Sequence, residues 1–218
     1  MSIFDKIAAS VMPPESAEDR AEARRKAQAM CQGPEDWLTL ALDHHRQIER
    51  LFEQARAGSD AAARRSACKQ LAAVLTAHAN AEESVFYPML AEDHKGHAAM
   101  AYQEQAMTKI EMHKLEMMEP MSQEWLDKLE HIQGAVAHHV YEEESTWFGE
   151  LREVMRGHDE AMHARRFREE FEKYTAGGEQ MERPMQMAAE MDEMRQPSGS
   201  GDFQGGNRFS ENTGPLDS

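Results

Sequence analysis

Apolar residues recur at steps of three and four along four long stretches of the chain, which is the spacing that places side chains on one face of an α-helix. The stretches cover residues 38–52, 71–89, 102–117 and 125–147, and one histidine interrupts each apolar stripe. Long runs of Val, Ile and Thr, typical of a large sheet, are missing. The pattern predicts an all-α four-helix bundle with one histidine from each helix pointing at its axis.

Turn and cap residues divide the chain into four predicted parts. Residues 1–33 form a leader, in which Ser16 and Asp19 are spaced to cap a short helix. The bundle is expected over 34–157 and a short fifth helix over 158–176. Within the bundle, Pro88 and Pro120 are expected to end the second and third helices. Residues 177–218, rich in Gly, Ser, Pro and Met, are predicted to be a disordered tail.

Charge and cysteine content narrow the class of protein. Twenty-four Lys and Arg against forty Asp and Glu give a net charge of -16, which disfavours nucleic acid as a partner. The two cysteines, Cys31 and Cys68, lie too far apart to suggest a disulfide framework or a redox motif. No stretch reaches the ~20 apolar residues that span a bilayer, and the first residues do not resemble a signal peptide. We therefore expect a cytoplasmic protein with no membrane partner.

The stripe histidines and two glutamates predict a metal centre. Glu82 and Glu143 follow the stripe histidines His78 and His139 by four residues, on the same helix faces. A buried carboxylate without a partner is costly, and several buried imidazoles and carboxylates need a shared counter-charge. Without thiolates a structural zinc site is disfavoured, whereas nitrogen and oxygen ligands that can bridge fit two iron ions. The predicted ligands are His45, His78, Glu82, His113, His139 and Glu143.

Four neighbours of these residues have predicted positions as well. His44 and His138 lie one residue away from a ligand, so we expect them to face outward or sideways into solvent, with a supporting position beside the ligands as the alternative. Asp43 and Glu144 are candidate acceptors that would orient an imidazole by a hydrogen bond.

Three segments resemble the helix signatures of the hemerythrin-like (HHE cation-binding) domain family: LALDHHRQIERLF, LTAHANAEESVFYPML and HHVYEEESTWF. The resemblance covers about residues 35–155. It implies an up-down-up-down bundle that holds two irons bridged by oxygen and by carboxylates, with His45 rather than His44 as the first ligand. It places the fourth-helix ligands on His139 and Glu143. Oxygen-carrying members have their acid one residue later, where this chain has Glu144, so the choice between Glu143 and Glu144 stays open. Met117 is expected where oxygen-carrying members have a fifth histidine, so the ligand set is more similar to members tied to sensing or to stress responses.

The expected function is that of a non-haem di-iron protein that senses, reacts with or stores O2, NO or peroxide, or stores iron itself. One alternative is an enzyme with peroxidase- or ferroxidase-like activity, although we lean towards a non-enzymatic role. Further alternatives are a reversible O2 carrier and an interaction protein whose histidines are vestigial. The methionines of the tail suggest a docking segment for a protein partner.

Overall fold

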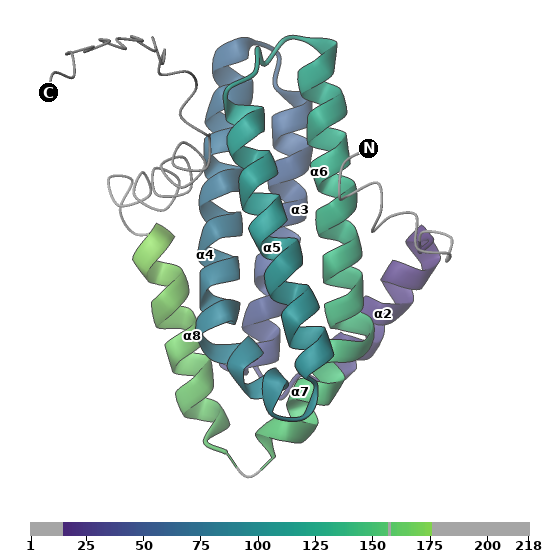
Figure 1. The fold of residues 1–218 in the computed structure, drawn as a ribbon, viewed down its shortest axis with the longest axis vertical. Helices are drawn as coiled ribbons and strands as arrows, with labels where there is room; N and C mark the ends of the chain where they lie inside the picture. The colour runs from purple at the N-terminus through teal and green to yellow at the C-terminus, as the bar shows by residue number, and fades with distance from the viewer. Residues whose placement is uncertain (1–14, 157, 176–218) are drawn as a thin grey trace, which may run out of the picture.

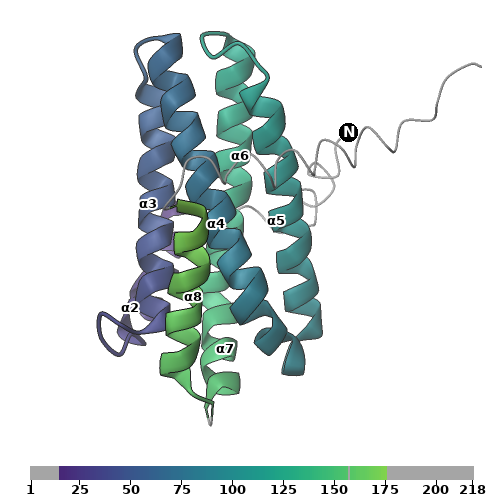
Figure 2. The same cartoon turned by 90° about the vertical axis from the view of Figure 1, so that its left-hand side faces the viewer.

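Four long helices lie side by side and shorter helices cover one end of the bundle they form (Figure 1). This computed structural model describes residues 15–156 and 158–175, so the predicted tail over 177–218 lies outside the described residues. The helices are α2 (Ala17–Ala29), α3 (Trp37–Ala57), α4 (Ala61–Asp93), α5 (Lys95–Glu116), α6 (Gln123–Glu142), the π-helix η1 (Glu143–Trp147), α7 (Phe148–Met155) and α8 (Glu160–Thr175). The all-α bundle is confirmed, and α3 to α6 run alternately up and down (Figures 1 and 2).

Helix α2 begins at the predicted cap. The Ser16 hydroxyl accepts a hydrogen bond from the Asp19 backbone N–H at 3.1 Å, and the Ser16 N–H donates to the Asp19 carboxylate at 2.9 Å. This reciprocal pair satisfies two N–H groups that the first turn of a helix otherwise leaves without partners. The leader helix then lies obliquely against the lower part of the bundle (Figure 1).

Helix α4 does not end at Pro88 as predicted but continues to Asp93. Proline removes one backbone hydrogen bond inside a helix and introduces a steric clash. The last turn is held by tertiary packing, because Met89 and Leu90 are buried in the core directly after the exposed Pro88. Packing therefore overrides the local preference.

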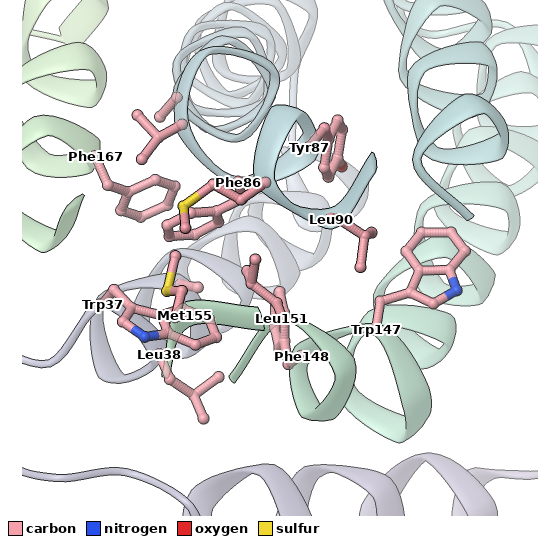
Figure 3. Packing of buried hydrophobic residues seen from close by; sticks show 14 of the residues in the cluster. Trp37, Leu38, Phe86, Tyr87, Leu90, Trp147, Phe148, Leu151, Met155 and Phe167 are labelled. Atoms are coloured by element: carbon pink, nitrogen blue, oxygen red, sulfur yellow. The ribbon is translucent and has the colours of Figure 1, made fainter. Parts of the chain in front are cut away.

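The buried apolar residues of the described chain form two clusters. The lower cluster includes Trp37, Phe86, Phe148 and Phe167, whose rings lie together in Figure 3. Ring centroids are 5.0 Å apart for Trp37 and Phe86, and 4.3 Å apart for Phe86 and Phe167. The upper cluster contains Ile48, Phe52, Leu71, Trp125 and Leu129. A polar layer that includes His45 and His78 lies along the helices between the two clusters.

The prediction of which face of α5 is buried is wrong. Tyr102, Ile110 and Met117 are 38%, 43% and 78% exposed. The buried face instead consists of small, polar and apolar residues: Ala98, Ala101, Gln105, Glu111, Met112 and Leu115. Helix α5 therefore turns a different side to the bundle from the one that its larger apolar residues suggest.

Helix α8 returns along the outside of α3 and α4, as Figure 2 shows. Its Phe167 is fully buried in the lower cluster, and Phe171 packs against both clusters. No helix in the described ranges is both long and apolar enough to cross a membrane.

Candidate metal centre

Two imidazoles and two carboxylates converge in the polar layer between the apolar clusters. His45, His78, Glu82 and Glu143 each offer one ligand atom, and these four atoms all lie within 4.8 Å of one another. None of the four residues is more than 4% exposed. The structure thus brings together four of the six predicted ligands, from α3, α4 and η1.

The polar atoms that face one another in this group lack hydrogen bonds. His45 Nε2 lies 3.2 Å from Glu143 Oε2, and His78 Nε2 lies 3.3 Å from Glu82 Oε1. Despite these short distances, all four atoms are buried and have no hydrogen-bond partner within the described part of the chain. Buried polar atoms without partners are rare and cost free energy. A cation among them would satisfy all four, so the donor set fits a metal ion.

His139 and Tyr87 extend the group on its other side. The Tyr87 hydroxyl lies 3.1 Å from both Glu82 Oε2 and Glu143 Oε1, and 3.2 Å from His139 Nε2. His139 Nε2 is also 3.4 Å from Glu143 Oε1. Each carboxylate therefore has one oxygen near His45 and His78 and the other oxygen near Tyr87. Sequence reasoning missed Tyr87, which follows Glu82 by five residues and therefore does not continue its stripe.

The structure does not bring His113 to this group. Gln105 is the α5 residue that reaches it, because its amide Nε2 donates to Glu82 Oε2 at 2.6 Å and to the Tyr87 hydroxyl at 2.5 Å. His113 lies eight residues further along α5, about 12 Å at the rise of an α-helix. Met117 follows the last residue of α5 and is exposed, so it does not occupy a ligand position either.

The π-helix turns two adjacent glutamates inward. Glu143 joins the group, while Glu144 Oε1 lies 2.8 Å from Nδ1 of His45. Neighbours on an α-helix point about 100° apart, and the wider turn of η1, where the Phe148 N–H donates to the Glu143 carbonyl, changes their directions. The expectation that Glu144 orients an imidazole is confirmed. No sequence signal identified the π-turn.

The leader helix supports this contact from outside the bundle. Arg24 donates to both oxygens of Glu144 at 2.8 to 3.0 Å, and its remaining nitrogen donates to Glu49 at 2.8 Å. On the opposite side of the centre, His139 Nδ1 lies 2.8 Å from Glu104. Each of these two imidazoles is thus held by a carboxylate at the nitrogen that faces away from the group.

The pKa values of the ionisable side chains in the group are shifted in different directions. Burial raises the pKa of Glu82 well above its usual range, and the charge of Glu143 raises it further. Burial alone would lower the pKa of His45, but the adjacent carboxylates of Glu143 and Glu144 raise it to about 9. Burial, followed by the charge on His45, lowers the pKa of His78. Strong perturbations of this kind concentrate at functional sites.

The other predicted neighbours have different roles. His44 is only partly exposed: its ring stacks on that of Phe171 of α8 with centroids 3.6 Å apart, and burial lowers its pKa to about 3. His138 is 45% exposed at its side chain and pairs with Glu15 at 3.0 Å. Asp43 is exposed and pairs with Arg46 on the surface, not with an imidazole.

A mostly apolar cavity of about 90 Å³ adjoins the group. His78, Gln105 and His139 line it on the side of the centre. The remaining lining residues include Ile48, Leu75, Met112, His113, Val136 and Val140. A space of this size holds a small molecule of a few atoms beside the candidate ligands.

A helical bundle with a buried group of imidazoles and carboxylates defines a class of all-α proteins that can hold a metal cation. The chain belongs to the hemerythrin family, because residues 38–151 match the hemerythrin HHE cation-binding domain. It is also similar to a protein of Nostoc sp. named DNA nickase, with 30% identity over 114 residues. The match covers 52% of this chain and 32% of that relative, so the chain spans about a third of the relative's length. No solved structure matches.

Proposed function

We propose that the buried group binds two iron ions and that this di-iron centre senses, reacts with or stores O2, NO or peroxide. The observation that carries the proposal is the set of unpartnered nitrogen and oxygen atoms that converge between the apolar clusters. Imidazole together with carboxylate suits iron, and the group contains no thiolate.

The two oxygens of each carboxylate have different neighbours, and this supports a site for two ions rather than one. Glu143 Oε2 faces His45, whereas Oε1 faces His139 and Tyr87. Glu82 Oε1 faces His78, whereas Oε2 faces Tyr87 and Gln105. Both glutamates can therefore bridge a position beside His45 and His78 to a position beside His139. When bound, the iron pair supplies redox electrons and open coordination positions for a small ligand.

Residues around the proposed iron pair orient its ligands by hydrogen bonds. Glu144 and Glu104 each orient one imidazole through its Nδ1, and Gln105 holds Tyr87 and Glu82 by hydrogen bonds. The apolar cavity of about 90 Å³ supports a ligand as small as O2 or NO. Five of the predicted ligands, His45, His78, Glu82, His139 and Glu143, make up the proposed set. His113 is left out of it.

The test loads the full-length protein with ferrous iron without air and measures metal content before and after oxidation. We expect about two irons per chain and an absorption in the near ultraviolet after oxidation, as expected of a bridged ferric pair. One tightly held zinc with no iron would refute the proposal. A degassing cycle then separates the alternatives, since a reversible carrier recovers its starting spectrum without reductant. Catalytic consumption of added peroxide would identify an enzyme.

The name of the Nostoc relative raises a nucleic-acid hypothesis for this chain. The aligned residues are only 32% of that relative, and the net charge of -16 disfavours a phosphate backbone. We propose that this chain does not act on DNA. Incubation of the protein with supercoiled plasmid should leave the plasmid intact and unshifted on a gel. Nicking that is lost in a His45→Ala variant would contradict this.

A further inference from the structure

A second group of metal-binding side chains lies at the lower end of the bundle, where α4, α5 and α7 meet. His94, His97 and Glu150 each offer one ligand atom, and these atoms lie within 4.8 Å of one another. His97 Nδ1 is 2.6 Å from Glu150 Oε2, and His94 Nδ1 is 3.5 Å from Glu150 Oε1. The side chains are 33%, 38% and 22% exposed, in contrast to the buried centre.

Backbone hydrogen bonds flank the two imidazoles at the junction of α4 and α5. His94 separates α4 from α5 with a non-helical conformation at φ -125° and ψ 54°. Its N–H donates to the Leu90 carbonyl at 2.8 Å, and its carbonyl accepts from the Ala98 N–H at 3.1 Å. His97 lies in the first turn of α5, and the rings of His94 and His97 are parallel within 5°. The junction of the two helices thus presents both imidazoles on one side.

The carboxylate comes from a separate, well-anchored element. Glu150 lies on α7, which is fixed to the lower cluster by Phe148 and Leu151 (Figure 3). Its two oxygens face the two imidazoles separately. A simple ion pair requires one imidazole, whereas this arrangement gathers two imidazoles and a carboxylate from three elements around one point.

We propose that His94, His97 and Glu150 form a solvent-facing site for one divalent transition-metal ion, such as Zn²⁺ or Ni²⁺. Two imidazoles exclude Ca²⁺ and Mg²⁺ as preferred ions, since those favour oxygen ligands. Three protein ligands leave further coordination positions to water or to another molecule. The net charge of -16 raises the local concentration of cations around the protein. None of the three residues belongs to the buried group, so the proposal is independent of the di-iron proposal.

Trp147 offers a spectroscopic reporter for this site. Its ring centroid lies 6.0 Å from that of His97 and 5.6 Å from that of His139. The indole therefore lies between the surface group and the buried centre. A bound Ni²⁺ ion at His97 should quench the fluorescence of Trp147.

The experiment titrates the iron-loaded full-length protein with Ni²⁺ and records calorimetric heat and tryptophan fluorescence. We expect one nickel ion per chain at this site, with partial quenching. His97→Gln and Glu150→Gln should each weaken binding by at least about tenfold, because each removes a ligand. The matched control is His158→Gln, an exposed histidine outside the group, which should bind as the unchanged protein does. Iron content should be the same in all variants.

The Trp147→Phe variant tests whether Trp147 is the source of the fluorescence change that accompanies binding. This variant should keep the calorimetric binding and lose most of the quenching. The proposal is overturned if the His97→Gln and Glu150→Gln titrations superimpose on that of the unchanged protein, or if the unchanged protein binds no nickel ion. Loss of binding in His158→Gln alone would also overturn it, by placing the ion elsewhere.

Discussion

Glu144 accepts a hydrogen bond from Nδ1 of His45 at 2.8 Å, and neither side chain is more than 3% exposed. In the neutral imidazole, a proton on Nδ1 leaves Nε2 as the unprotonated nitrogen, and Nε2 is the atom that faces Glu143 across the group. The contact therefore selects the form of His45 that can bind a metal ion. Arg24 in turn keeps Glu144 charged and oriented.

Replacing Glu144 with Ala should weaken iron binding by about 10- to 100-fold, because His45 loses the group that orients it. Iron content would be measured after dialysis against a chelator of graded strength. Glu49→Ala is the matched control, since Glu49 contacts the same Arg24 but is 56% exposed at its side chain. Equal losses in the two variants would mean that Arg24, rather than the orientation of His45, governs the affinity.

Replacing His139 with Ala should reduce the iron content from about two ions to one or none, because His139 faces the second position of the proposed pair. Its neighbour provides the control. His138→Ala removes only a pair with Glu15 at the surface and should keep its iron. Metal analysis compares the iron content of the two variants. A lower iron content in His138→Ala than in His139→Ala would refute the proposed ligand set.

Replacing Phe167 with Ala should lower the free energy of unfolding by about 3–5 kcal/mol, because its fully buried ring leaves a cavity between α8 and α4. Urea denaturation followed by circular dichroism measures this change. Met117→Ala should change the stability by less than about 0.5 kcal/mol, because Met117 is 78% exposed. A large loss in Met117→Ala would mean that Met117 faces the bundle after all.

The thiol of Cys68 should react slowly at neutral and mildly alkaline pH. Burial, with a contribution from Glu116, raises the pKa of Cys68 to about 12. Below that pKa the thiolate fraction rises tenfold per pH unit, so alkylation of Cys68 should accelerate steadily above pH 8. The folded state holds the proton more tightly than the unfolded state, so this thiol also lowers stability as pH rises from the ordinary value of 9.0. Mass spectrometry after iodoacetamide treatment, with the less buried Cys31 as internal reference, measures the rates. Equal labelling of both at pH 8 would contradict this.

Periodicity predicted the helices well where one face is strongly apolar. The stripe of α3 placed His45 at the centre, and the spacing of His78 and Glu82 placed both on one face of α4. Local cap chemistry predicted the start of α2 at Ser16. Each of these features depends on residues that are close in sequence. A sequence pattern contains this kind of local information.

Helix α5 could not be predicted in the same way, because its inner face carries Ala98, Ala101 and Gln105 in place of large apolar residues. Tyr102 lies on the outside, where its hydroxyl donates to the Glu83 carbonyl at 2.9 Å. The selection of His113 followed from that misleading stripe. The π-turn at Glu143 and the burial of His44 under α8 depend on contacts between distant segments, which no local pattern contains.

The family match over 38–151 leaves out both α2 and α8. Yet Arg24 of α2 fixes the carboxylate behind His45, and Phe171 of α8 covers His44. The stretch that this chain shares with its relatives is thus shorter than the stretch that encloses its own centre. Without α2 and α8, these two sides of the group would be open to water. The two helices outside the matched stretch, α2 and α8, therefore limit the access of water to the candidate centre from two sides of the bundle.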